Sequence, residues 1–140
     1  GGSSGGALST GTERYYLMIG MVHVTTETLV SATGSGVWFQ YDDSASSQWQ
    51  TVTRKVGTKE LQNTAVNVVA SETYFTLEAR RIGSEEYHFY INGTLATTHT
   101  ASAPSSASNY FAVILEKSIG STLRGIAIDS VEIVNPLTRT

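Results

Sequence analysis

Two carboxylates near the C-terminus, Asp129 and Glu132, are the residues of this 140-residue chain whose spacing comes nearest to acid–base chemistry. A retaining glycosidase uses two carboxyl groups about 5–5.5 Å apart, one as nucleophile and one as acid/base. Both residues lie in the run "LRGIAIDSVEIV" (123–134), whose alternation predicts a strand with Ile126 and Ile128 buried. The two residues between the carboxylates place them on opposite faces of a strand unless a bulge intervenes. We therefore expect a structural strand here.

The three histidines, His23, His88 and His99, are the next candidates, as metal ligands. His88 and His99 flank a predicted hairpin turn, and pairing around that turn would bring residue 88 roughly opposite residue 97. This supplies two nitrogen ligands at best, without a nearby carboxylate, whereas zinc needs about three or four protein ligands. We expect solvated or partly covered hairpin histidines, and no metal.

A calcium loop and a catalytic nucleophile are the other two kinds of site for which the chain has candidate residues. Asp42 and Asp43 precede the run "SASS" and could begin a calcium loop. However, calcium needs about six to eight oxygen ligands, and an Asp-Asp turn after a strand is common without an ion. No serine lies in a Gly-x-Ser-x-Gly elbow, and the chain has no cysteine. The sequence thus predicts no cofactor, no catalytic residue and no enzymatic activity.

The composition argues against a nucleic-acid-binding protein and against a membrane-spanning one. The chain has a net charge of −3, and 15% of its residues are charged. It has no basic stripe for a phosphate backbone, so we expect no nucleic-acid partner. No apolar run is long enough to span a membrane. We expect one domain over residues 14–136, preceded by a flexible Gly/Ser-rich lead-in (1–13) to which something is attached upstream, and followed by a short tail (137–140).

The elements that position these residues are strands, because apolar residues recur with a period of two. In the run 15–24 the residues of odd number and those of even number are both largely apolar, which predicts a strand buried on both faces. Beta-branched and aromatic residues dominate the runs, while Gly, Ser, Asn and Asp separate them. Short connections force antiparallel pairing, so the sequence predicts an all-β sandwich or barrel of about ten strands. The predicted strands are 15–24, 36–42, 47–56, 64–70, 73–82, 87–91, 94–100, 109–117 and 123–134.

The clearest local signal is the Asn92-Gly93 pair within "EEYHFYINGTLATTHT" (85–100). These two residues accept the positive φ angles of a type I′ turn, whose twist matches that of the flanking strands. The turn sets the register, so Tyr87, Phe89 and Ile91 are expected on one face of the sheet.

The order "GVWFQYD…SQWQTVTRKVG…TAVNV…YFTLEARR…FYINGTLATT…GIAIDSVEIV" resembles concanavalin A-like jelly-roll domains over residues 14–135. It is similar, more narrowly, to structural domains of phages and prophages on tail fibres, receptor-binding proteins and capsid decorations. The resemblance implies two antiparallel sheets packed face to face, and a location on a virion surface or outside the cell. The related endo-glucanases carry a Glu-x-Asp-x-x-Glu strand, which this chain matches at Asp129 and Glu132. Ala127 replaces the nucleophile, so no glycosyl-enzyme can form.

Aromatic side chains are the remaining binding candidates, because exposed rings serve as stacking platforms for sugars. Trp38 is expected on the face of its strand opposite to that of Val37 and Phe39, and Tyr90 on the face opposite to that of Phe89. Trp49 is assigned to the core. Tyr110 follows the polar loop 97–109, a plausible place for contacts with partners.

Three functions remain open. The first is a non-enzymatic virion structural or attachment domain, expected to be a homo-oligomer, with a trimer expected from the way such appendages are built. It would contact other virion proteins. The second is a carbohydrate-binding module or lectin that recognises a cell-surface glycan, and the third is a glycoside hydrolase. Fold analogy places them in that order.

Overall fold

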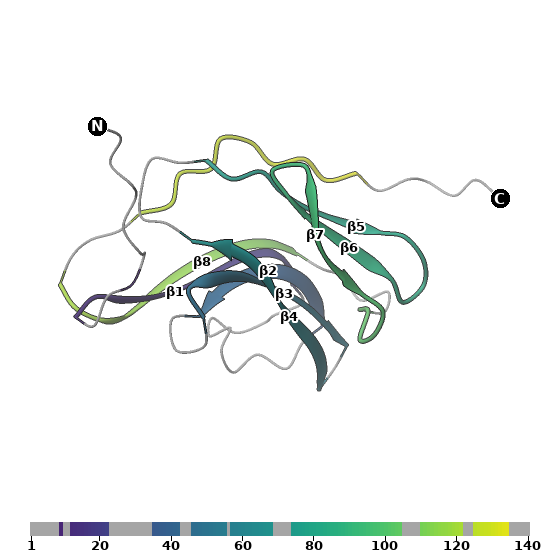
Figure 1. Ribbon diagram of the computed structural model, residues 1–140, viewed down its shortest axis with the longest axis horizontal. Coiled ribbons are helices and arrows are strands. Elements are labelled where there is room, and N and C mark those ends of the chain that lie inside the picture. The colour runs from purple at the N-terminus through teal and green to yellow at the C-terminus, as the bar shows by residue number, and fades with distance from the viewer. Residues whose placement is uncertain are drawn as a thin grey trace.

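The computed structural model describes residues 9, 12–22, 35–42, 46–55, 57–68, 74–104, 110–121 and 125–134. Within these ranges the protein is all-β, with no helix, and its strands form two antiparallel sheets (Figure 1). The predictions of an all-β chain and of antiparallel pairing in two sheets are confirmed. The strands are β1 (Arg14–Val22), β2 (Gly36–Asp42), β3 (Gln48–Lys55), β4 (Thr58–Asn67), β5 (Leu77–Arg81), β6 (Tyr87–Ile91), β7 (Thr94–His99) and β8 (Tyr110–Ile119).

The larger sheet has five strands in the order β4-β3-β2-β1-β8, and the smaller has three in the order β5-β6-β7. The smaller sheet lies over one face of the larger one (Figure 1). β8 pairs with β1 although most of the chain separates them, and β4 contacts β7 across the two layers. The larger sheet is thus completed by pairing between the first and the last of its strands along the chain.

The main hydrophobic core lies between the two sheets and follows the expected period of two. Val37, Phe39 and Tyr41 of β2 face it, and Phe89 of β6 is completely buried in it. The rings of Phe39 and Phe89 meet edge to face with their centroids 5.3 Å apart, a favoured aromatic geometry. Trp49 lies in the same core, as the sequence predicts.

A second hydrophobic cluster lies on the opposite face of the larger sheet. It consists of Met18, Val22, Trp38 and Val52, each at most 4% exposed. β1 therefore contributes alternate residues to two apolar clusters, which confirms the prediction of a strand buried on both faces. Gly20 lies directly opposite Trp38 in the ladder, and a Cβ atom at Gly20 would collide with the Trp38 backbone.

The hairpin between β6 and β7 has the turn that the sequence predicts. Asn92 and Gly93 both have positive φ angles, of 52° and 79°, which a type I′ turn requires. Tyr87, Phe89 and Ile91 are buried as expected. A register shift between Phe89 and Tyr90 moves the partner of His88 to Thr98, one residue beyond the position predicted from a regular ladder.

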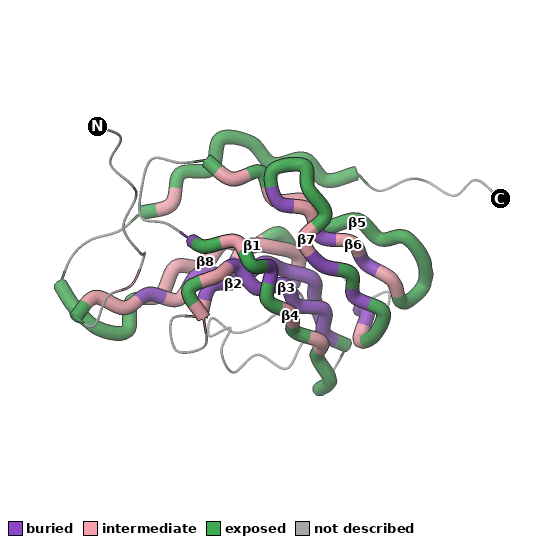
Figure 2. The backbone as a smooth tube through the Cα atoms, viewed as in Figure 1, coloured by how far each residue is buried: buried purple, intermediate pink, exposed green. Residues whose placement is uncertain are grey.

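Three strand predictions differ from the structure. The predicted strand 73–82 is shorter than expected, since β5 covers Leu77–Arg81 and residues 74–76 lie outside it. β4 begins at Thr58, not at residue 64, because the largely polar residues 58–63 also pair with β3; a register shift in this pair accompanies Ala65, which has a φ angle of 63°. The C-terminal run predicted as a strand is outside any strand over 125–134. Ile126 packs against the main core, but most of this segment is exposed (Figure 2). The alternation of apolar residues indicates which side chains can be buried. It does not show whether a neighbouring strand is present to pair with the segment.

Candidate functional site

A buried polar network joins the two sheets and is centred on His99, which is completely inaccessible to solvent. Its Nε2 atom lies 2.8 Å from the Thr51 hydroxyl, and its Nδ1 atom lies 3.0 Å from the Thr53 hydroxyl. Glu60 Oε2 approaches Nδ1 to 3.2 Å, and the Thr51 and Thr97 hydroxyls are 2.7 Å apart. The expectation of a solvated or partly covered histidine is thus wrong for His99, because β7 directs it between the sheets.

The hydrogen bonds around His99 assign its protons. The Thr53 hydroxyl donates to the carbonyl of Ala101 at 2.9 Å, so the Thr53 oxygen accepts from Nδ1–H. Nε2 is then the acceptor of the Thr51 hydroxyl. Burial lowers the pKa of His99, and the nearby carboxylate of Glu60 opposes that shift. A neutral imidazole with its proton on Nδ1 satisfies every partner.

The contacts from Thr51 to His99 and from His99 to Glu60 have the connectivity of a nucleophile, a base and an orienting acid. Catalysis by this trio would need a substrate at the Thr51 oxygen. Thr51 is 0% exposed, and Glu60 already accepts the backbone N–H groups of Thr100 and Ala101 at 3.1 and 3.2 Å. The trio is a structural link that holds β7 against β3 and β4.

A second polar network crosses the opposite face of the larger sheet. The Trp38 indole N–H and the Tyr16 hydroxyl both donate to Gln40 Oε1, at 2.9 and 3.2 Å. Gln40 donates to Gln50 at 3.0 Å, and Gln50 donates to Asn63 at 2.8 Å. Amides beside aromatic rings are the groups that bind sugars, but Trp38 is only 4% exposed. In this arrangement the ring of Trp38 offers little surface to a ligand.

Charged groups around this face fix the protonation of Tyr16. Burial, with the nearby charges of Asp42 and Glu116, raises the pKa of Tyr16 to about 12, while Arg54 acts in the opposite direction. The Arg54 guanidinium lies 4.9 Å from the centroid of the Trp38 ring, a cation–π distance. Tyr16 therefore remains a hydrogen-bond donor at neutral pH, and the network stabilises the sheet.

Tyr90 lies on the outer face of the smaller sheet, among groups that can form hydrogen bonds. It is half-buried, and the Arg80 guanidinium lies over its ring at 4.9 Å. Arg80 also pairs with Glu78, and His88 on the same face pairs with Glu86 at 2.8 Å. We call these five residues the Tyr90 face. It combines an aromatic ring with charged donors and acceptors, which are the kinds of group that contact polar ligands.

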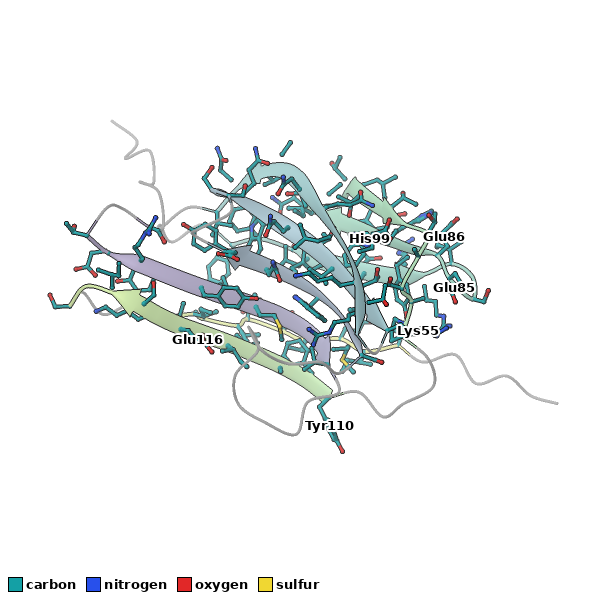
Figure 3. The ribbon with its side chains drawn as sticks, turned by 90° about the horizontal axis from the view of Figure 1, so that it is seen from below. Lys55, Glu85, Glu86, His99, Tyr110 and Glu116 are labelled. Atoms are coloured by element: carbon teal, nitrogen blue, oxygen red, sulfur yellow. The ribbon has the colours of Figure 1, made fainter. Side chains whose placement is uncertain are left out.

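Tyr110 is the third candidate, and it lies at the start of β8. It is 62% exposed and projects away from the sheet (Figure 3). Phe111 and Ile119, at the two ends of the same strand, are also exposed. The structure does not bring Trp38, Tyr90 and Tyr110 together, because they belong to the outer face of the larger sheet, the outer face of the smaller sheet and the β8 edge.

The acidic candidates lie apart from one another. Asp42 ends β2, and Asp43, like His23, lies outside the described residues. Asp129 and Glu132 are both exposed. Over the described ranges, no three His, Cys, Asp or Glu residues are grouped closely enough to hold a metal ion.

Sequence reasoning missed the Thr51–Thr53–Glu60 set around His99. The available signal was the alternation of Thr51, Val52 and Thr53 in a Thr-rich strand, which is compatible with a buried polar face. Glu60 has no local signal, because the apolar pattern predicts this strand only from residue 64. Buried polar side chains are identified only when their partners in other strands are known.

None of the comparisons with known proteins gives a match: no family model, no curated protein and no solved structure is similar to this chain at a significant level. In the part of the chain that the structure describes, no helix is long and apolar enough to cross a membrane.

Proposed function

We propose that this chain is a non-enzymatic structural or attachment domain of a virion, with a sandwich of the concanavalin A-like jelly-roll type. The observation that carries the proposal is a set of large apolar side chains on the outside of the domain. They lie at the ends of β8 and along residues 125–134. The members are Tyr110, Phe111, Ile119, Ile128, Val131, Ile133 and Val134, with exposed fractions between 37% and 74%.

Isolated apolar residues are ordinary on a protein surface, and we interpret the occurrence of several on one strand and one segment as the sign of an interaction site. Seven such residues on two short stretches would be a solubility burden for a free domain. In a particle they are covered by neighbouring subunits. A component of a tail, fibre or capsid therefore fits this surface better than a domain that acts alone.

Two further observations support the type of fold. The five-stranded and three-stranded sheets enclose a common core, which is the arrangement expected of a jelly-roll sandwich. The motifs of the resemblance also fall on successive strands, namely β2, β3, β4, β5 and the β6–β7 hairpin, apart from the last motif (125–134), which lies outside any strand.

Co-fractionation tests this function. Particles would be purified on a density gradient from a culture that produces the protein, and each fraction would be probed for the chain. We expect the chain to migrate with the particle peak and to remain there after a high-salt wash. Recovery only at the top of the gradient, with intact particles elsewhere, would reject the proposal.

The Tyr90 face favours a second candidate, the binding of a cell-surface glycan. Aromatic rings beside charged hydrogen-bonding groups suit a sugar, which has apolar ring faces and polar edges. A glycan array with the purified domain would be compared with the Tyr90→Ala variant. The matched control is Tyr74→Ala, which removes a tyrosine that is 68% exposed and outside this face. A signal lost only in Tyr90→Ala supports glycan binding, and an array without signal removes it.

A further inference from the structure

The larger sheet ends in β8, a ten-residue strand whose outer edge pairs with no described residue. Its first six residues, Tyr110 to Leu115, carry no charge. A long apolar strand with unpaired backbone N–H and C=O groups is a template for another strand, and proteins normally protect such edges.

The other sheet edges are protected. β4 carries the irregular residue Ala65 and the exposed Lys59. β7 is covered by β4, whose Gln62 donates to the carbonyl of Thr98 at 2.7 Å. β5 presents the exposed Arg80 beside a second arginine. Bulges, charged side chains and covering groups are the usual ways to block pairing. Among the described edges, only the first six residues of β8 lack them, since Glu116, Lys117 and a register shift lie nearer the other end of that strand.

We infer that β8 is an interface for a second copy of this chain, which pairs antiparallel to it and joins the two larger sheets into one. A two-fold axis at Ile114 places Ile114 opposite its own copy. Ala112 then faces Glu116, and Phe111 faces Lys117. Directly opposite residues interact across an antiparallel pair, and this register places no like charges opposite each other.

The register also keeps the faces of the two sheets continuous. Val113 and Leu115 become partners, while the positions of even number (Ala112, Ile114 and Glu116) are matched among themselves. A two-fold interface uses the same patch on both subunits. A trimer built from sheet edges would require β8 to pair with a different edge, and the other described edges are protected. The inferred assembly is therefore a dimer, and it does not depend on the proposed virion role.

Charge substitution at Ala112 tests the register. In the dimer, Ala112→Glu places two glutamates opposite the Glu116 residues, whereas Ala112→Lys places two lysines there. We expect sedimentation equilibrium to give a dimer dissociation constant about tenfold higher, or more, for the glutamate variant than for the lysine variant. Both substitutions insert a long side chain at the same site, so a general packing defect would affect them alike. Equal dissociation constants would contradict the Ile114 register.

Cysteine cross-linking tests the pairing itself, because the chain has no cysteine of its own. Opposed Cα atoms lie about 4.5–5.5 Å apart in an antiparallel pair, within the range that a disulfide spans. We expect Ile114→Cys to form a covalent dimer under mild oxidation, and Leu61→Cys on the opposite edge of the sheet to remain monomeric. Val113→Cys and Leu115→Cys, the neighbouring positions, complete the scan. A monomeric wild-type protein with no cross-link at any of the three β8 positions would overturn the inference, whatever the result of the particle fractionation.

Discussion

Replacing Thr51 by valine is the most informative perturbation of the link between the two sheets. Valine has nearly the shape of threonine but has no hydroxyl group. The variant loses the contact with Thr97 at 2.7 Å and the contact with His99 Nε2 at 2.8 Å. Both lie in a region where Thr51 and His99 have no exposure, so water cannot replace the hydroxyl.

The expected cost follows from these contacts. A typical net hydrogen bond contributes about 1 kcal/mol, and a buried group left without a partner costs about 1–3 kcal/mol. The Thr97 hydroxyl can rotate, whereas the His99 nitrogen is fixed in the ring. We therefore expect Thr51→Val to lower the free energy of unfolding by about 2–4 kcal/mol. That is a large part of the roughly 5–15 kcal/mol that stabilises a typical domain.

Urea unfolding followed by tryptophan fluorescence measures this difference, since Trp49 lies in the same strand and in the main core. The experiment is run at pH 8, where His99 is neutral in both the folded and unfolded chains. Thr51→Ser keeps the hydroxyl, loses one methyl group and should cost about 1 kcal/mol. Thr98→Val changes an exposed threonine on β7 and should stay within about 0.5 kcal/mol of wild type. A cost for Thr51→Val no larger than that of Thr51→Ser would refute the reasoning.

Three further predictions concern pH and packing. Burial lowers the pKa of His99, so below about pH 6.5 the unfolded chain binds more protons than the folded chain. The free energy of unfolding should therefore fall with falling pH. A His99→Gln variant should lack this slope in urea titrations between pH 5 and 8. The pKa of Tyr16 is raised to about 12, so its contribution, complete below pH 10, should be lost as pH rises towards 12, and Tyr16→Phe should flatten alkaline unfolding curves. Gly20→Ala should reduce the thermal midpoint because its Cβ would meet the Trp38 backbone, whereas Gly83→Ala, at a position with open space, should leave the midpoint nearly unchanged.

The parts of the fold that the sequence predicts are those governed by local chemistry. Asn92-Gly93 requires positive φ angles whatever the rest of the chain does, so the β6–β7 hairpin and the inward face of β6 follow from the sequence. In β1 the residues of odd number and those of even number are both largely apolar, which likewise indicates two buried faces. These features depend on neighbouring residues, which a single sequence shows directly.

The parts that the sequence does not predict depend on partners far along the chain. β4 begins earlier than its apolar pattern suggests, because the largely polar residues 58–63 pair with β3. The burial of His99 follows from its position opposite Thr51 and Thr53, which lie more than forty residues earlier. Trp38 shows the same limit, because alternation gives the face on which it lies but not the cluster with Met18 and Val52 that buries it. A binding site is the hardest to infer, since its residues come from strands whose neighbours are unknown.

The proposal that this domain belongs to a virion is tested most directly by locating it on a particle. Antibodies raised against the folded domain would be coupled to gold and applied to particles purified from a culture that produces the chain. Electron micrographs should show gold at one repeated position on each particle, and preincubation of the antibodies with the purified domain should abolish the label. Intact particles without gold, in a preparation whose soluble fraction contains the chain, would contradict the proposal.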